Sequence, residues 1–402
     1  MSSYVRHYVS IAPVSIPLSL ASCFIIPPMS TSVNMIHIIV FLLGSVMVIF
    51  TLSSALSTFV LPRAARSQLN RIVFGILRRM INFIMHFAKT YSRRDAIMAY
   101  YAPIGLMLLL PTWYVLILFG YAAMFWSLNA GDWFAVFRLS GSSLIGLGFD
   151  ASETMFVTIL VFSEAMIGLI LVAMLIAYLP TMYSAFSRRE QVVNMLEVRA
   201  GSPPSALEML LRFNRNQGLD KLADYWKVWE QWFADIEESH TTLPALIFFR
   251  SPRAENSWIT AAGAVLDAAS ITLAAVDIPY EISAALSIRA GFLALRRIAT
   301  YFDIPNPQNP QYPETPICIE RREFEEVINQ LLAAGLPIKA DREKVWRDFA
   351  GWRVNYDRVL ILLCGLVMAP QAPWSSDRAP QFHLTPLMLL KKHRLALREE
   401  NT

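Results

Sequence analysis

Charged residues are scarce in this sequence. Only 16% of its 402 residues are Asp, Glu, Lys or Arg, whereas 55% are hydrophobic, and the mean hydropathy is +0.42. Soluble globular domains carry more charge than this, so the composition excludes an ordinary soluble protein and predicts a membrane protein. The formal net charge of +4 gives no reason to expect a nucleic-acid partner, because the basic residues collect beside the apolar segments.

Cysteine is also scarce, and the usual enzyme motifs are missing. Cys23, Cys318 and Cys364 lie far apart and form no CxxC or Cys/His spacing, which argues against a disulfide framework and a zinc site. The sequence has no phosphate-binding loop, GxGxxG fingerprint, HExxH motif or hydrolase elbow. The isolated His240 is expected to lie in a loop rather than to act as a catalytic base. We therefore expect no enzyme activity, no cofactor and no metal site.

Three apolar segments are long enough to cross a bilayer as helices, which takes about 20 residues. They cover residues 35–61, 97–126 and 154–183. The connector between the first two carries eight Arg or Lys residues against Asp95, and Arg188 and Arg189 follow the third. Short basic connectors stay in the cytoplasm, so we expect a multi-pass protein of the inner (plasma) membrane with a cytoplasmic C-terminus.

The basic connector, residues 63–95, repeats apolar residues at helical intervals from Leu69 to Phe87, with arginines on much of the remaining surface. This pattern predicts an interfacial helix on the anionic inner leaflet. The alternative is an ordinary helix packed on the cytosolic domain. Residues 1–34 stay ambiguous between a fourth span, a cleaved signal segment and an extracellular arm, and residues 20–23, LASC, resemble a lipoprotein processing box.

The connector between the second and third spans contains the stretch SGSSLIGLGFD, residues 140–150, after an amphipathic segment that begins near Trp133. The order of span, short outer helix, glycine-containing apolar strand and span resembles the pore module of the two-transmembrane potassium-channel superfamily. This resemblance covers less than a quarter of the chain. It implies a homotetramer around a pore, with potassium as the permeant ion, because one chain offers one pore loop.

Backbone carbonyl rings replace the water around a dehydrated cation, and glycine permits the torsions that direct them to one axis. The resemblance implies a filter formed by Ser143, Leu144, Ile145, Gly146, Leu147, Gly148 and Phe149. It places acids of the outer mouth at Asp150 and Glu153, and inner-helix candidates at Glu164 and Gly168.

The filter departs from the usual Thr-Val-Gly-Tyr-Gly in either of two registers. The first, which we prefer from the sequence, puts Gly146 and Gly148 on the two family glycines and Leu144 on the threonine. The second puts Gly148 on the first glycine, Phe149 on the aromatic position and Asp150 on the second glycine. Potassium selectivity is thus implied by the resemblance alone.

An acid at membrane depth is costly unless it faces protein or water, so Glu164 is a functional candidate, with Arg138 as a possible partner. The alternative for Glu164 is a protonated, structurally paired acid. The alternative for the whole stretch is a re-entrant turn without conduction, in a nonconducting membrane scaffold whose helical domain binds another protein.

Two apolar segments in the second half, near residues 258–300, imitate spans but are interrupted by Asp267 and Arg289. We interpret them as a buried hairpin, the alternative being two more spans. The expected fold is thus an all-α membrane protein that lies in a lipid bilayer, with an unknown cytosolic partner or ligand possible. Its parts are a signal-like or membrane segment at 1–34, an extra transmembrane helix at 35–62, the basic interfacial helix at 63–95, a pore module of helix, pore loop and helix at 96–187, and a helical cytosolic domain with a flexible tail at 188–402.

Overall fold

The structure is a computed structural model that describes residues 35–59, 67–88, 90–150 and 154–379. The expectations for residues 1–34, for Glu153 and for the end of the tail lie outside this part of the chain. Within it, every regular element is a helix, and the only extended pairing is an isolated bridge between Val276 and Ile338. The chain is an all-α membrane protein.

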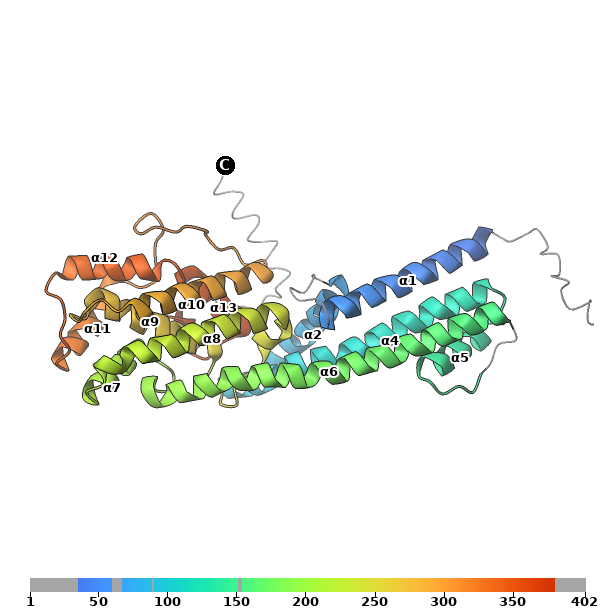
Figure 1. Cartoon of the computed structure of the whole chain (residues 1–402), viewed down its shortest axis with the longest axis horizontal. Helices are drawn as coiled ribbons and strands as arrows, with labels where there is room; N and C mark the ends of the chain where they lie inside the picture. The colour runs from blue at the N-terminus through green and yellow to red at the C-terminus, as the bar shows by residue number, and fades with distance from the viewer. Residues whose placement is uncertain (1–34, 60–66, 89, 151–153, 380–402) are drawn as a thin grey trace, which may run out of the picture.

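The molecule is elongated and has two halves (Figure 1). One half contains α1 (Met35–Phe59), α2 (Gln68–Met85), α3 (Tyr91–Ala99), α4 (Tyr101–Ser127), α5 (Trp133–Leu144) and the first part of α6 (Met155–Ala200). The other half, which we call the C-terminal domain, follows α6. It contains α7 (Ala206–Arg215), η1 (Leu219–Lys221), α8 (Leu222–Thr242), η2 (Pro244–Phe248), α9 (Trp258–Ala275), α10 (Ile282–Tyr301), α11 (Arg321–Ala333), α12 (Arg342–Arg353), α13 (Asp357–Val367) and η3 (Ser376–Arg378).

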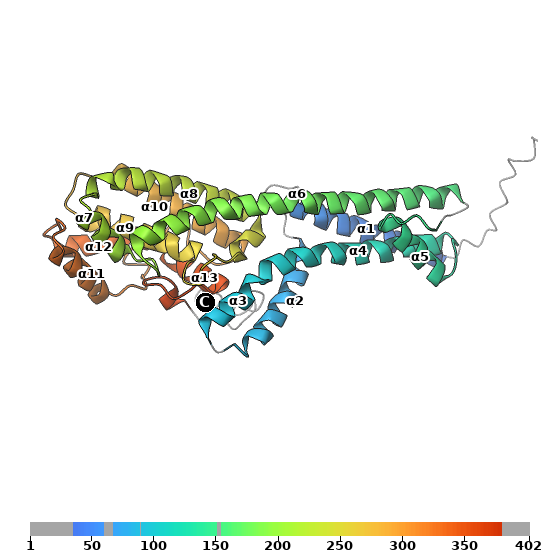
Figure 2. The same cartoon turned by 90° about the horizontal axis from the view of Figure 1, so that it is seen from below.

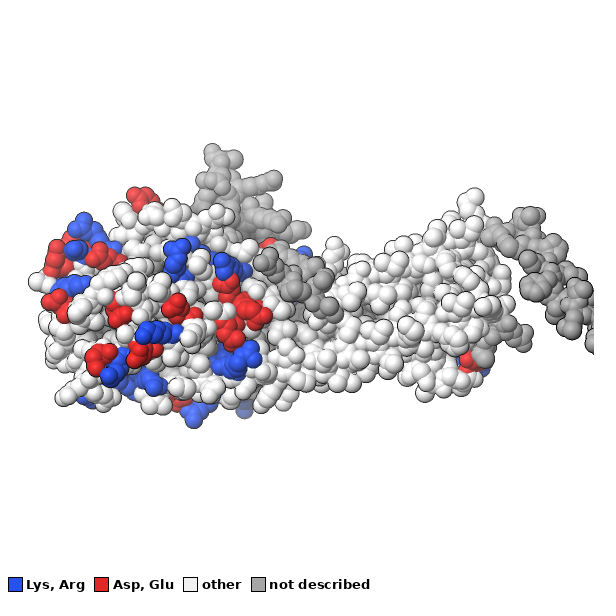
Figure 3. Space-filling view, in the orientation of Figure 1, with Lys and Arg blue, Asp and Glu red and all other residues white. Residues whose placement is uncertain are grey.

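Charged residues are concentrated in one of the two halves. On the face shown in Figure 3, Lys, Arg, Asp and Glu cover the C-terminal domain, while the half with α1 and α4 is almost free of them. Large apolar side chains of α1 and α6 are exposed, among them Leu43, Ile49, Phe162 and Leu169. A surface of this kind is stable in lipid and costly in water, so the apolar half is the part embedded in the membrane.

Four helical segments of the described chain are long and apolar enough to span a membrane, namely α1, α3 with α4, α6 and α9. Helix α9 differs from the others because nearly all of its residues are buried, with α10 and α12 as its main neighbours. Protein therefore occupies the faces that a span would turn to lipid. This arrangement matches a buried hairpin inside the C-terminal domain rather than a fourth crossing.

Helices α1 and α4 approach closely through glycine. A Cβ at Gly44 would lie 2.5 Å from the carbonyl oxygen of Gly120, and a Cβ at Gly120 would lie 2.7 Å from a methyl group of Val48. Small residues at a membrane helix contact let the backbones pack by dispersion forces, which is the main attraction left where lipid is as apolar as the side chains. Helix α1 is thereby fixed against the helix that leads to α5.

Helix α6 runs without a break for 46 residues and ends at Ala200, where Gly201 adopts a φ of 81°. The expected boundary between residues 187 and 188 therefore lies inside a continuous helix. Figure 2 shows this helix running from the apolar half into the C-terminal domain. Helix α6 therefore links the two halves as one element, with Pro180 inside it.

Helix α2 has two apolar faces. Leu77 and Ile81 are buried, and Arg78 is buried with them, donating to the carbonyl of Leu366 over 3.4 Å. The other face exposes the large apolar side chains of Ile72, Ile76, Met80 and Phe83, and Phe87, just after the helix, is exposed as well. The helix therefore contacts the C-terminal domain, as the packed alternative requires, and also keeps an uncovered apolar stripe, as an interfacial helix requires.

Candidate functional site

Residues 133–144, which include the start of the stretch SGSSLIGLGFD, form α5, a short helix held beside α4 and α6 at the end of the apolar half farthest from the C-terminal domain (Figure 2). Asp132 caps its N-terminus by accepting a hydrogen bond from the amide of Ala135 at 2.8 Å. Val136 and Leu139 are buried against the neighbouring helices, while Trp133 and Phe134 are exposed. The helix thus has one face for its own chain and one for lipid or another subunit.

A glycine turn ends α5. Gly146 and Gly148 have φ values of 77° and 66°, which L side chains rarely adopt. The amide of Gly146 donates to the carbonyl of Ser143 at 2.9 Å, and the amide of Leu147 donates to the carbonyl of Ser142 at 2.8 Å. This is the pair of bonds of a Schellman cap.

Ser142 organises the rest of the loop. Its hydroxyl oxygen accepts hydrogen bonds from the amides of Phe149 at 3.0 Å and Asp150 at 3.4 Å. Sequence reasoning missed this residue. The only available signal was the serine run that precedes the glycines, and a serine run is common in plain loops.

The loop is therefore polarised. Every amide from Ile145 to Asp150 donates to a carbonyl or hydroxyl oxygen at the end of α5. Among the residues that the structure describes, no hydrogen bond ends on the carbonyl oxygens of residues 145–149. The backbone presents free acceptors and no free donors, which is the arrangement a dehydrated cation requires.

The seven predicted filter residues are divided between helix and loop. Ser143 and Leu144 are buried and belong to α5, whereas Ile145, Leu147 and Phe149 are each more than 60% exposed. The carbonyl oxygen of Leu144 lies against α6, because a Cβ at Gly168 would come within 2.1 Å of it. The end of the helix therefore favours the second register, in which the filter starts at Gly146, over the register preferred from the sequence.

The two charged candidates near the loop have partners other than those expected. Arg138 donates two hydrogen bonds to Asp150, at 2.6 and 3.1 Å, and is not bonded to Glu164. Glu164 is fully buried and accepts from the Ser140 hydroxyl at 2.5 Å. Its second oxygen has no partner among the described residues. Glu164 thus joins α6 to α5 behind the loop, and Asp150 is largely neutralised.

Further hydrogen bonds join α5 and α4 to α6. The Ser143 hydroxyl donates to the carbonyl of Val161 at 2.7 Å, and the Tyr114 hydroxyl donates to the carbonyl of Gly168 at 2.8 Å. Gly168, singled out from the sequence as a flexible position, is a point of close contact in this structure. The loop therefore rests on a base of hydrogen bonds that joins three helices.

A second buried polar cluster lies where α6 enters the C-terminal domain. Arg189 is fully buried and donates to the carbonyls of Leu246 at 2.9 Å and Phe249 at 2.7 Å, and it pairs with Glu190 at 2.8 Å. His240 lies 3.3 Å from the same guanidinium. It belongs to α8 and is fully buried, so the expectation of a loop histidine was wrong. Burial, together with the neighbouring Arg189, lowers the pKa of His240.

A third cluster lies in the core of the C-terminal domain. Arg353 pairs with Asp267 at 2.6 Å and with Asp357 at 2.7 Å, and it also donates to the carbonyl of Trp374 at 2.7 Å. Asp267 interrupts the apolar pattern of α9 because its carboxylate forms the ion pair with Arg353. Burial raises the pKa of the nearby Cys318 thiol to about 12, so it does not supply a reactive thiolate. The cluster joins α9, α12 and α13.

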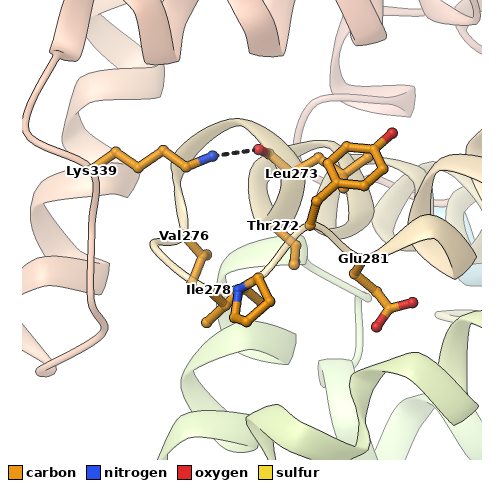
Figure 4. Close-up of a pocket in the computed structure, with 8 residues that line it drawn as sticks. Thr272, Leu273, Val276, Ile278, Glu281 and Lys339 are labelled. Carbon is orange, nitrogen blue, oxygen red and sulfur yellow. Dashed lines mark hydrogen bonds between the residues drawn. The ribbon is translucent and has the colours of Figure 1, made fainter.

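A small hollow of about 70 Å³ lies at the turn between α9 and α10 (Figure 4). Its lysine, Lys339, donates to the carbonyl of Leu273 at 2.7 Å, which ties the ammonium group to the end of α9. The described residues also contain no cluster of His, Cys, Asp or Glu that would hold a metal ion. The loop after α5 is therefore the strongest candidate site in the described part of the chain, since it combines a polarised backbone, an exposed position and a support of hydrogen bonds. No family model, curated protein or solved structure matches this chain.

Proposed function

We propose that the chain is the subunit of a homotetrameric channel for monovalent cations, with potassium as the preferred ion and the loop that starts at Gly146 as its filter. One observation carries the proposal: the loop uses all its amides internally and leaves its carbonyl oxygens free. Four such loops around an axis place rings of carbonyl oxygens where a dehydrated cation passes.

The surroundings of the loop support the same function. A filter must resist collapse when ions leave it, and the hydrogen bonds of Ser140 to Glu164 and of Ser143 to Val161 brace α5 against α6. The exposed side chains of Ile145, Leu147 and Phe149 supply apolar surface that neighbouring subunits would cover. We assign Glu164 the role of a positioning residue, because it acts on the loop through Ser140.

The orientation belongs to the same proposal. The basic residues near α2 and the pair Arg188 and Arg189 put the C-terminal domain in the cytoplasm of the inner (plasma) membrane, and the loop on the outer side. Because α6 is continuous, the C-terminal domain moves with the pore-lining helix and is placed to control opening.

The second candidate is a nonconducting membrane scaffold. It is favoured by the Schellman cap, since the same pair of bonds ends many helices that carry no ion site. In that case the C-terminal domain supplies the function by binding a partner, and the loop only turns the chain back into the membrane.

Cation flux from liposomes tests the proposal. Purified protein is reconstituted with an outward potassium gradient, and parallel samples carry sodium or chloride gradients. We expect potassium flux that exceeds sodium flux. Gly146→Val should abolish it, because a β-branched residue strains a backbone with a φ of 77°.

A second variant tests the observation on which the proposal depends, the internal hydrogen bonding of the loop amides. Ser142→Ala removes the acceptor for the amides of Phe149 and Asp150 and should reduce potassium over sodium selectivity roughly tenfold. Ser205→Ala is the matched control, because its hydroxyl makes no cap bond at the start of α7. If vesicles with the wild-type protein conduct no cation under any gradient, the result would favour the nonconducting scaffold.

A further inference from the structure

A cavity of about 420 Å³ lies between α6 and the end of α8, apart from the loop and its support. One wall is the stretch of α6 from Pro180 to Arg188, and the other contains Glu238, Thr242 and Leu243. Figure 1 shows these two helices side by side where the apolar half meets the C-terminal domain. The long apolar run of α6 ends here, so the cavity lies at the level of the phospholipid headgroups.

The cavity has a cationic wall and an anionic wall. Arg188 is half exposed, donates to the Ser184 hydroxyl at 3.1 Å and pairs with Asp235 at 3.2 Å. On the facing helix, the carboxylate of Glu238 accepts from the Thr242 hydroxyl at 3.4 Å and has no ion pair among the residues described. The hydroxyls of Ser184, Thr181 and Thr242 lie along the same cavity.

The two walls match a ligand that carries both charges. A phosphate group accepts charge-assisted hydrogen bonds from a guanidinium and neutral ones from hydroxyls. A primary ammonium group donates to a carboxylate such as that of Glu238. Pro180, Ala185 and Leu243 add apolar lining. Leu179 and Tyr183, on the same stretch of α6, are exposed apolar side chains that acyl chains can contact.

We propose that this cavity binds the headgroup of a zwitterionic phospholipid with a primary ammonium, of the phosphatidylethanolamine class. The phosphate contacts Arg188 and the ammonium contacts Glu238, while the acyl chains lie along the apolar surface of α6. The lipid thereby links α6 to α8. Binding requires that the protein lies in a membrane but does not depend on conduction. A failure of this inference would therefore leave the channel proposal untouched, and the reverse is also true.

Native mass spectrometry of the purified full-length protein tests the site. The protein is titrated with phosphatidylethanolamine and, separately, with phosphatidylcholine of identical acyl chains. We expect the ethanolamine lipid to bind roughly tenfold more tightly, because the trimethylated ammonium cannot donate to Glu238. Glu238→Gln should bring the two affinities within about twofold, and Arg188→Gln should weaken both, since it removes the phosphate contact.

Matched controls come from the far end of the molecule. Arg322→Gln and Glu326→Gln change the same residue types at exposed positions of α11 and should leave both affinities unchanged. Glycerophosphoethanolamine has the same headgroup without acyl chains and should bind more weakly than the lipid, because it lacks the contacts of the acyl chains with α6. Equal binding of the two lipids by the wild type, or an unchanged preference in Glu238→Gln, would overturn the proposal.

Discussion

At the scale of single residues, the buried polar side chains decide which helices are joined. His240 receives a hydrogen bond from Arg189 at its Nε2 atom at 3.3 Å, and Ser239 lies 3.1 Å from its Nδ1 atom. Acceptance at Nε2 requires the neutral imidazole, because a protonated ring has no acceptor. Protonation would also set a second positive charge against Arg189. The folded state therefore depends on an uncharged His240.

This dependence predicts acid sensitivity. The pKa of His240 in the folded protein is well below its ordinary value of 6.5, so the unfolded chain binds the extra proton first as the pH falls. The stabilisation is present above that ordinary value and is lost below it. We expect about 1 kcal/mol less stability at about pH 5.5 than at about pH 7.5 from this residue.

Thermal unfolding in detergent at both pH values measures the effect. His240→Gln should flatten the pH dependence of the unfolding midpoint, while His86→Gln, at the exposed C-cap of α2, should not change it. An unaltered pH dependence in His240→Gln would show that other groups cause the acid sensitivity.

At the scale of elements, the contact between α5 and α6 positions the loop after α5. It is tight because Gly168 has no side chain and the carbonyl of Leu144 occupies the space that a Cβ would need. The polar bonds from Ser140 and Ser143 lie along the same contact. Helix α6 also carries this contact to the C-terminal domain without a break.

Gly168→Ala should therefore displace the end of α5. Overpacking of this kind costs about 1 to 3 kcal/mol, and we expect both a lower unfolding midpoint and reduced potassium flux in the liposome assay. Gly351→Ala in α12 is the matched control, because a Cβ there meets no atom within 4 Å. That change should leave flux intact and favour the helix by roughly 0.5 to 1 kcal/mol. A Gly168→Ala protein with normal flux and stability would contradict a tight contact at this position.

At the scale of the whole molecule, one chain leaves its candidate site incomplete. A single loop supplies acceptors on one side of an ion, and a closed ring of oxygens needs further copies. The exposed aromatic face of α5, with Trp133, Phe134 and Phe137, lies next to this loop. Neighbouring subunits or lipid must cover it.

The mass of the particle in detergent checks the assembly. We expect four copies of the 45.4 kDa chain by light scattering combined with size-exclusion chromatography. Ser205→Ala should keep this mass. A monomer or dimer would refute the ring and favour the scaffold.

Composition and local pattern were sufficient to predict an all-α membrane protein, long helices close to α1, α4 and α6, and a short helix that begins near Trp133. These properties depend on a residue's neighbours along the chain, because apolar length and helical spacing are set locally. The glycines at 146 and 148 also marked the loop, since a positive φ favours glycine at each position.

Only the tertiary structure decided which polar groups meet. In the folded chain Arg138 is bonded to Asp150, and Ser140 is bonded to Glu164. The Ser142 hydroxyl accepts from the loop amides, and His240 is buried beside Arg189. The tertiary structure also enclosed α9 in protein. Hydropathy could not distinguish that helix from a span, because lipid and a protein core are both apolar, and the partner of a buried charge depends on how distant helices pack.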